Sequence, residues 1–205
     1  MILALDYGDK KTGYAIGSNF ISKSGTVNTT QLNKLLEKFQ KVVLGIPLSM
    51  SGNYSTQSFK VLKFAYKLKR KGMDVFLIDE RLTTKMALSF NAKDDDAFSA
   101  RQIFMDYIKN PILSQKFVLE KFLDVEFDCE DVEDVLYYEV SPVKGKKGDA
   151  LTRNFSIAFL HMKEKNFVYR NEDTIEKRYN LVIANEKFKD VVDKFLKNGG
   201  KIILV

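Results

Sequence analysis

This sequence of 205 residues contains very little cysteine and histidine, one residue of each: Cys129 and His161. A single cysteine excludes an internal disulfide and any zinc site that needs several cysteines. A single histidine excludes a metal site with paired histidine ligands and argues against a Ser-His-Asp triad. A metal site in this chain would therefore be built mainly from carboxylates.

Long hydrophobic runs are also absent. No apolar stretch approaches the roughly 20 residues that span a bilayer. The first residues, MILALDYGD, lack the charged segment and the cleavage site of a signal peptide. Hydrophobic residues make up 45% of the chain and charged residues 29%, as in ordinary soluble proteins. We therefore expect a cytoplasmic protein that does not enter a membrane.

The positive charge of the chain is concentrated in its first half. Residues 1–110 contain 17 Lys and Arg against 10 Asp and Glu, whereas residues 111–205 contain 16 against 17. A basic surface attracts polyanions by Coulomb attraction and by release of counterions. Nucleic acid is therefore a reasonable partner, although a basic soluble protein without such a partner has the same composition.

The order of hydrophobic runs predicts an α/β fold for residues 1–110. Three short strands come first and two continuous apolar strands follow, with helices after the third and later strands. The predicted strands are residues 2–7, 14–17, 21–27, 41–46 and 75–78. This order indicates a mixed five-stranded sheet, with three antiparallel strands and then two parallel ones, flanked by helices.

Residues 111–205 are predicted to form an additional small α+β domain of unknown role. Short strands are expected at residues 155–160, 167–169, 181–184 and 201–205, and a helix is expected at residues 188–196. The pattern does not predict a topology for these elements.

Three acidic residues fall where the predicted strands end. Asp6 ends the first strand, Glu80 follows the strand at 75–79, and Asp96 begins a helix that runs to Lys109. In open sheets, functional sites gather at the carboxyl ends of neighbouring strands. Asp96 shares one helix face with Ala100, Ile103 and Tyr107, so its side chain is expected to point toward the sheet.

Three clustered carboxylates repel one another unless a cation neutralises them. Hard oxygen ligands suit Mg²⁺ or Mn²⁺, and two such ions can together activate water and stabilise a leaving oxygen on phosphorus. We therefore predict Asp6, Glu80 and Asp96 as ligands of two ions. Asp94 and Asp95 are alternatives for the third ligand, although Asp94 suits a helix cap and Asp95 lies on a polar helix face.

Four stretches of the sequence resemble the YqgF family of pre-16S ribosomal RNA nucleases, also called Holliday-junction-resolvase-like proteins. They are LALDYGDKKTGYAIG (3–17), VVLGIPLSMSGNYSTQ (42–57), VFLIDERLTTKMA (75–87) and DAFSARQIF (96–104). The resemblance covers about residues 1–110 and implies a ribonuclease H-like fold, with Asp6, Glu80 and Asp96 in the metal-binding roles. It also implies a phosphate contact for Arg81.

Further candidates for substrate contacts lie in two loops near these acids. Lys10 and Lys11 occupy the turn after Asp6 and are candidates to hold backbone phosphates, although the family commonly has Lys-Arg at this place. Ser51 and Asn53 lie in a polar loop whose side chains are candidates for sugar or phosphate contacts. Both loops are equally consistent with solvated surface residues.

The expected function is that of a metal-dependent nuclease that hydrolyses phosphodiester bonds, with RNA as the favoured substrate and pre-16S rRNA processing as the role. A Holliday junction resolvase acting on branched DNA is the first alternative, because metal and phosphate are common to both substrates. A non-catalytic nucleic-acid-binding module is the second. An ATPase related to actin and sugar kinases is disfavoured, because such enzymes need two similar domains.

Overall fold

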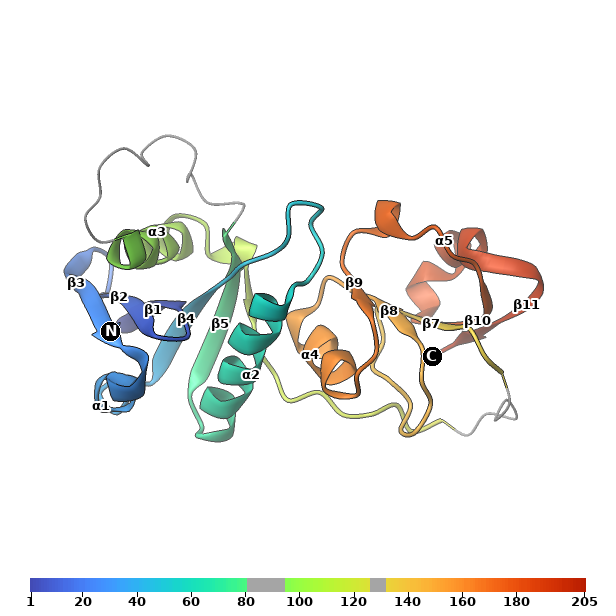
Figure 1. Ribbon diagram of the computed structural model, residues 1–205, viewed down its shortest axis with the longest axis horizontal. Helices are drawn as coiled ribbons and strands as arrows, with labels where there is room; N and C mark the ends of the chain where they lie inside the picture. Colours follow the sequence, from blue (N-terminus) through green and yellow to red (C-terminus); the bar gives the residue numbers. More distant parts are fainter. Residues whose placement is uncertain (81–94, 126–131) are drawn as a thin grey trace. The chain divides into compact units, whose positions relative to one another are not determined.

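The computed structural model describes residues 1–80, 95–125 and 132–205 of the chain. These residues form two compact units (Figure 1). The first unit comprises Met1–Leu48 and Ser55–Val118, and the second comprises Ser49–Tyr54 and Leu119–Val205. The segment Ser49–Tyr54 therefore belongs to the second unit, although it lies within the first unit in sequence. No helix in the described ranges is long and apolar enough to cross a membrane.

The first unit contains a mixed sheet of six strands in the order β3-β2-β1-β4-β5-β6. Strands β1, β2 and β3 are antiparallel, β4 and β5 run parallel to β1, and β6 is antiparallel to β5. The strands are Ile2–Tyr7, Lys11–Gly17, Ile21–Asn28, Lys41–Ile46, Asp74–Asp79 and Ser114–Lys116.

The predicted arrangement of three antiparallel strands followed by two parallel strands is confirmed. The structure adds β6 as a sixth strand at the edge of the sheet, formed by residues beyond the expected boundary at 110. The sequence of β6 is Ser-Gln-Lys, which has no hydrophobic alternation. An edge strand of this kind carries no pattern that distinguishes it from a loop.

Helices cover both faces of this sheet (Figure 1). Helix α3 (Asp95–Lys109) packs through Ala100, Ile103 and Phe104 on the small residues Ala4 and Ala15, together with Val43 and Ile78. Helix α2 (Thr56–Arg70) packs on β4 and β5, and α1 (Leu32–Leu36) is one short helix before β4. The predicted end of α3 at Lys109 is confirmed. The helix ends there because Pro111, which follows, cannot continue it.

The second unit contains a five-stranded sheet in the order β11-β10-β7-β8-β9, and every neighbouring pair is parallel. The strands are Val135–Tyr138, Asp149–Leu151, Val168–Tyr169, Tyr179–Ala184 and Leu196–Leu204 for β7 to β11. The strands expected at 167–169 and 181–184 are confirmed. The last strand begins earlier than expected, at Leu196.

The expected strand at residues 155–160 is wrong, because these residues form helix α4 (Phe155–Lys163). The side chain of Asn154 caps this helix by accepting hydrogen bonds from the main-chain nitrogens of Ser156 and Ile157. Six of the nine helical residues are buried, so the segment lacks the polar face that identifies an amphipathic helix. A short, continuous apolar run has the same appearance in a buried strand and in a buried helix.

Helices lie on both faces of the second sheet. Val192 of α5 (Lys189–Val192) packs in one cluster with Leu136 and Val182. His161 of α4 contacts Tyr137, the neighbour of Leu136 in β7, with ring centroids 5.0 Å apart. Because successive side chains of a strand point to opposite faces, α4 and α5 cover opposite sides of the sheet.

His161 is fully buried and has a hydrogen-bond partner at each ring nitrogen. Nε2 lies 2.9 Å from the carbonyl oxygen of Val140 and donates to it, while Nδ1 lies 3.0 Å from Nδ2 of Asn166 and accepts from it. Burial lowers the pKa of His161 to about 4, and the Val140 carbonyl opposes this shift only in part. The ring is therefore neutral and structural at pH 7.

This burial predicts that acid destabilises the second unit. The folded pKa lies below the unfolded value near 6.5, so between these values the unfolded chain binds a proton that the folded chain excludes. Lowering the pH from 7 to 4 is expected to remove roughly 3 kcal/mol of unfolding free energy through this one group. Urea denaturation of the wild type and of His161→Gln at pH 7 and pH 4 measures this loss. Equal pH dependence of the two proteins would contradict the prediction.

Candidate active site

Asp6 is flanked by a glycine on each neighbouring strand. In β2 it pairs with Gly13, and in β4 it lies level with Gly45, because the preceding pair is Leu5 and Leu44. Ala4 packs against α3, so Asp6, two residues later, points to the same face of the sheet. The next residue, Tyr7, stacks on Phe64 of α2, with ring centroids 4.2 Å apart, which places it on the opposite face.

Glu80 reaches the same place from β5. Val43 belongs to the cluster beneath α3, so position 45 in β4 faces α3 too, and the side chain of Glu80, which directly follows β5, lies against it. A β-carbon built at Gly45 would lie 2.5 Å from Oε1 of Glu80 and 2.4 Å from Cδ1 of Ile103. The carboxylate of Glu80 therefore occupies space that any side chain at position 45 would fill, next to Asp6.

Asp96 approaches from the first turn of α3. A β-carbon built at Gly13 would lie only 1.8 Å from the main-chain oxygen of Asp96. The absence of a side chain at Gly13 therefore allows the start of the helix to rest directly on the strand that pairs with Asp6. The predicted inward face of the helix is confirmed, since Ala100, Ile103 and Tyr107 are buried against the sheet.

Asp6, Glu80 and Asp96 thus converge on one end of the α3 face. Across residues 1–80, 95–125 and 132–205, however, no three acidic, histidine or cysteine side chains are placed closely enough to hold a metal ion. The convergence of the main chain is observed, whereas the metal-binding roles stay a prediction. Carboxylates provide the hard oxygen donors that Mg²⁺ or Mn²⁺ prefers.

Some of the other predicted site residues lie outside the described residues. Arg81 and Asp94 fall in the range 81–94, and the side chain of Asp95 is not described either. The predicted phosphate contact of Arg81, and the choice between Asp96 and its two neighbours as third ligand, therefore stay predictions.

Lys10 and Lys11 lie beside Asp6 in a turn that is tied to the rest of the sheet. Thr29 donates its hydroxyl to the carbonyl oxygen of Gly8 at 2.7 Å and its main-chain nitrogen to that of Lys10 at 2.9 Å. Both lysine side chains are exposed. Both lysines therefore lie in or next to the turn that follows β1, and their contact with a phosphate backbone stays a prediction.

Ser51 and Asn53 belong to the second unit, and Asn53 is fully engaged there. Its Oδ1 accepts hydrogen bonds from the main-chain nitrogens of Arg170 and Asn171, at 2.8 and 3.0 Å. Its Nδ2 donates to Oγ1 of Thr174 at 2.8 Å, and the carbonyl oxygen of Ser51 accepts from Asn171. These contacts give Asn53 a structural role that the polarity of its loop did not reveal.

Asn53→Ala is therefore expected to destabilise the second unit. The substitution removes three hydrogen bonds and leaves two main-chain donors without their acceptor, at a cost of about 1–3 kcal/mol. Chemical denaturation measures the difference. Asn53→Asp keeps an acceptor for the main-chain nitrogens of Arg170 and Asn171, so it is expected to lose less unfolding free energy than Asn53→Ala. A denaturation midpoint unchanged by the alanine would show that these bonds do not hold the segment.

The comparisons with known proteins agree with this geometry. The family described as "RuvX: Holliday junction resolvase" matches residues 1–124, which include every predicted site residue and the whole sheet of the first unit. The chain belongs to the RuvX family. RuvX proteins have a ribonuclease H-like fold, so the fold predicted for residues 1–110 and the predicted family resemblance are both confirmed. The additional domain is α/β and not α+β as predicted, because every neighbouring pair of strands in its sheet is parallel.

Individual relatives differ in how much of the chain they match. A protein of Thermotoga maritima is 34% identical over 209 residues, which covers 99% of this chain and 94% of its own length. A protein of Rickettsia typhi is 37% identical over 134 residues, covering 54% of this chain and 85% of its own length. Both carry the name "Putative pre-16S rRNA nuclease". Most of the second unit thus lies beyond the residues that the RuvX family matches, whereas the Thermotoga relative aligns with nearly the whole chain.

Proposed function

We propose that this chain is a nuclease that hydrolyses phosphodiester bonds of nucleic acid at the α3 end of its first sheet. The observation that supports this most directly is the setting of Asp6 between Gly13 and Gly45. One glycine admits the start of α3, which carries Asp96, and the other admits the carboxylate of Glu80. Membership of the RuvX family supports the same conclusion.

Asp6, Glu80 and Asp96 would hold two Mg²⁺ or Mn²⁺ ions, which supply Lewis-acid activation of the phosphate and of the attacking water when bound. Asp6 is the best positioned of the three, because it projects from a central strand that is hydrogen-bonded on both sides. Lys10 and Lys11 would bind backbone phosphates next to the scissile one. Arg81 follows Glu80 in sequence, and its guanidinium group would bind phosphate through two parallel hydrogen bonds.

Precursor 16S rRNA is the favoured substrate, since the two relatives described above are both named for it. Branched DNA is the second candidate, since the description of the family names the Holliday junction. The acidic site itself would recognise metal and phosphate, which the two substrates share.

A side-by-side cleavage assay tests the proposal. The full chain would be incubated with precursor rRNA, single-stranded DNA and a four-way junction, each with Mn²⁺, with Mg²⁺ or with excess chelator. Cleavage of precursor rRNA that requires the metal is the expected result, and preferential cleavage of the junction would favour the second candidate. Binding without cleavage under all conditions would overturn the proposal and leave a nucleic-acid-binding module.

A further inference from the structure

The second unit has the strand order of doubly wound nucleotide-binding sheets. Counted along the chain, its five strands lie in the order 3-2-1-4-5, with β7 at the centre. The chain moves outward from β7 through β8 to β9 and then returns to β10 on the other side of β7. In such parallel sheets, ligands bind outside the carboxyl ends of the strands at the point where the order reverses.

A cavity of about 360 Å³ lies at that point. Tyr138 and Glu139 contribute to it from the end of β7, and Phe188 contributes from the connection that follows β10. Arg153, Arg170 and Glu172 complete the polar part of its lining, from the connections that follow β8 and β9. Small-molecule sites in proteins commonly have volumes of about 300–1,000 Å³, so the cavity is large enough for a small ligand.

Aromatic rings form one wall of this cavity. Tyr138 and Phe188 meet edge to face with centroids 5.0 Å apart, and Tyr138 also packs against Phe195 at 5.8 Å. Val191 and Leu151 extend the apolar lining. A rigid apolar wall of this kind suits the flat ring of a ligand.

The charged groups of the cavity favour an anion. The carboxylate of Glu139 already accepts hydrogen bonds from Oγ1 of Thr152 at 2.7 Å and from the main-chain nitrogen of Arg153 at 2.8 Å. Glu172 lies 3.3 Å from Nζ of Lys194. Both carboxylates of the cavity therefore already have partners, and its lining also includes Arg153 and Arg170, whose guanidinium groups can bind phosphate through paired hydrogen bonds.

Glu139 adopts a main-chain conformation that non-glycine residues seldom adopt, with φ of 54°. This conformation is unfavourable for a residue with a side chain and persists only where surrounding contacts impose it. Here it directs the Glu139 carboxylate onto Thr152 and Arg153, which fixes the turn between β8 and α4 beside the cavity.

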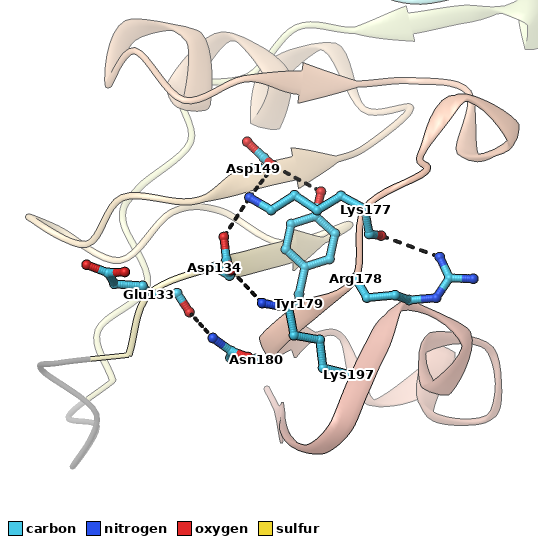
Figure 2. Close-up of polar contacts among 8 residues, drawn as sticks. All are labelled: Glu133, Asp134, Asp149, Lys177, Arg178, Tyr179, Asn180 and Lys197. Atoms are coloured by element: carbon cyan, nitrogen blue, oxygen red, sulfur yellow. Dashed lines mark hydrogen bonds and ion pairs between the residues drawn. The ribbon is translucent and has the colours of Figure 1, made fainter.

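At the opposite edge of the same sheet, where its strands have their amino-terminal ends, charged side chains form ion pairs (Figure 2). Asp134 lies between Lys177 and Lys197, at 2.8 and 2.6 Å, and Tyr179 donates to Asp149 at 2.9 Å. The two lysines lower the pKa of Asp134 to about 2. A larger hollow lies there, but Lys177 pairs with both Asp134 and Asp149, and the residues that line this hollow in the described part of the chain include no aromatic ring. The carboxyl edge is therefore the better candidate for an anionic ligand.

We propose that the cavity at the carboxyl ends of β7 and β10 binds a 5′-mononucleotide, either free or as the phosphorylated end of a nucleic-acid strand. The base lies against Tyr138 and Phe188, and the phosphate lies against Arg153 and Arg170. This site is separate from the acidic residues of the first unit and does not depend on the proposed nuclease function.

Calorimetric titration of the full-length chain tests this site with defined probes. The probes are the four 5′-mononucleotides, a 5′-phosphorylated trinucleotide, the nucleosides, ribose 5-phosphate and inorganic phosphate. At least one mononucleotide is expected to bind, and its nucleoside and ribose 5-phosphate are each expected to bind at least about 10-fold more weakly. A trinucleotide that binds more tightly than the free nucleotide would identify a strand end as the ligand. Equal affinity for ribose 5-phosphate, or binding of none of the nucleotide probes, would overturn the proposal.

Matched variants locate the binding. Arg153→Gln and Arg170→Gln are each expected to weaken nucleotide binding at least about 10-fold, because each removes a charged donor to the phosphate. Arg178→Gln removes an arginine at the opposite edge and is expected to leave binding unchanged. Phe188→Leu tests the aromatic wall if an arginine variant proves unstable by thermal denaturation. Undiminished binding by the folded variants would overturn the assignment.

The same titration with Asp6→Asn separates this proposal from the nuclease proposal. Nucleotide affinity in this variant is expected to equal that of the wild type, whatever the outcome of the cleavage assays. A loss of nucleotide binding in Asp6→Asn would place the ligand at the acidic residues of the first unit and overturn the inference.

Discussion

Asp6→Asn is expected to abolish cleavage of nucleic acid while the protein stays folded. The substitution preserves the size of the side chain but removes the negative charge that a divalent cation requires. Because Asp6 projects from the central strand β1, between Gly13 and Gly45, no neighbouring acid on β2 or β4 replaces it. The rate is expected to fall by at least about 10²-fold, the effect of losing one preorganised electrostatic group in an active site.

Asp9→Asn is the matched control for this experiment. Asp9 lies three residues away, in the turn after β1, is exposed, and pairs with Lys60 at 2.5 Å. Its replacement is expected to change cleavage little. Both variants would be assayed for cleavage rate and for Mn²⁺ affinity by calorimetry, with circular dichroism to verify folding. Wild-type cleavage by Asp6→Asn would remove the central residue of the proposed site.

Gly13→Ala is expected to reduce both stability and cleavage. Its new methyl group would lie 1.8 Å from the main-chain oxygen and 2.3 Å from the main-chain carbon of Asp96. Main-chain atoms in the first turn of a packed helix cannot turn aside as a side chain can, so α3 must shift away from the sheet. Overpacking of this kind costs typically 1–3 kcal/mol, and here it also displaces Asp96 from Asp6.

Two other glycines provide graded comparisons. At Gly45, the nearest atoms to a new methyl group belong to the side chains of Ile103 and Glu80, so cleavage is expected to fall more than stability. At Gly25 in β3, the nearest atoms belong to the phenol ring of Tyr14, 2.9–3.3 Å away, and a small shift accommodates them. Denaturation and cleavage assays of the three alanine variants measure this order. A fully active Gly13→Ala would show that α3 does not depend on this contact.

The second unit changes how the loop between β4 and α2 is understood. Asn53 anchors Ser49–Tyr54 to residues 170–174, and the hydroxyl of Tyr54 donates to the carbonyl oxygen of Thr152 at 3.1 Å. Arg170 and Arg153 line the proposed nucleotide cavity beside these anchoring contacts. The loop therefore belongs to the second unit by its contacts, although β4 and α2 on either side of it belong to the first.

The fold of the first unit was largely predictable because its strands are continuous apolar runs. Residues 2–7, 41–46 and 75–78 are buried on both faces, so their composition alone distinguishes them from the surface. The end of α3 was predictable because Pro111 cannot continue a helix. The short polar strand β6 and the buried helix α4 were not predictable, because neither has the periodicity of its element.

The sequence by itself determined which residues are candidates for chemistry. Asp6, Glu80 and Asp96 stand out because each acid follows or precedes an apolar element, and local order is sufficient to show this. Only the tertiary structure decided that two nearby glycines make room for other elements and that the amide of Asn53 holds its loop in place. Gly13 and Gly45 create space only because α3 and Glu80 arrive from distant parts of the chain, and Asn53 bonds to residues more than 100 positions away. Such contacts depend on packing between elements, which the spacing of residues along a single strand or loop does not specify.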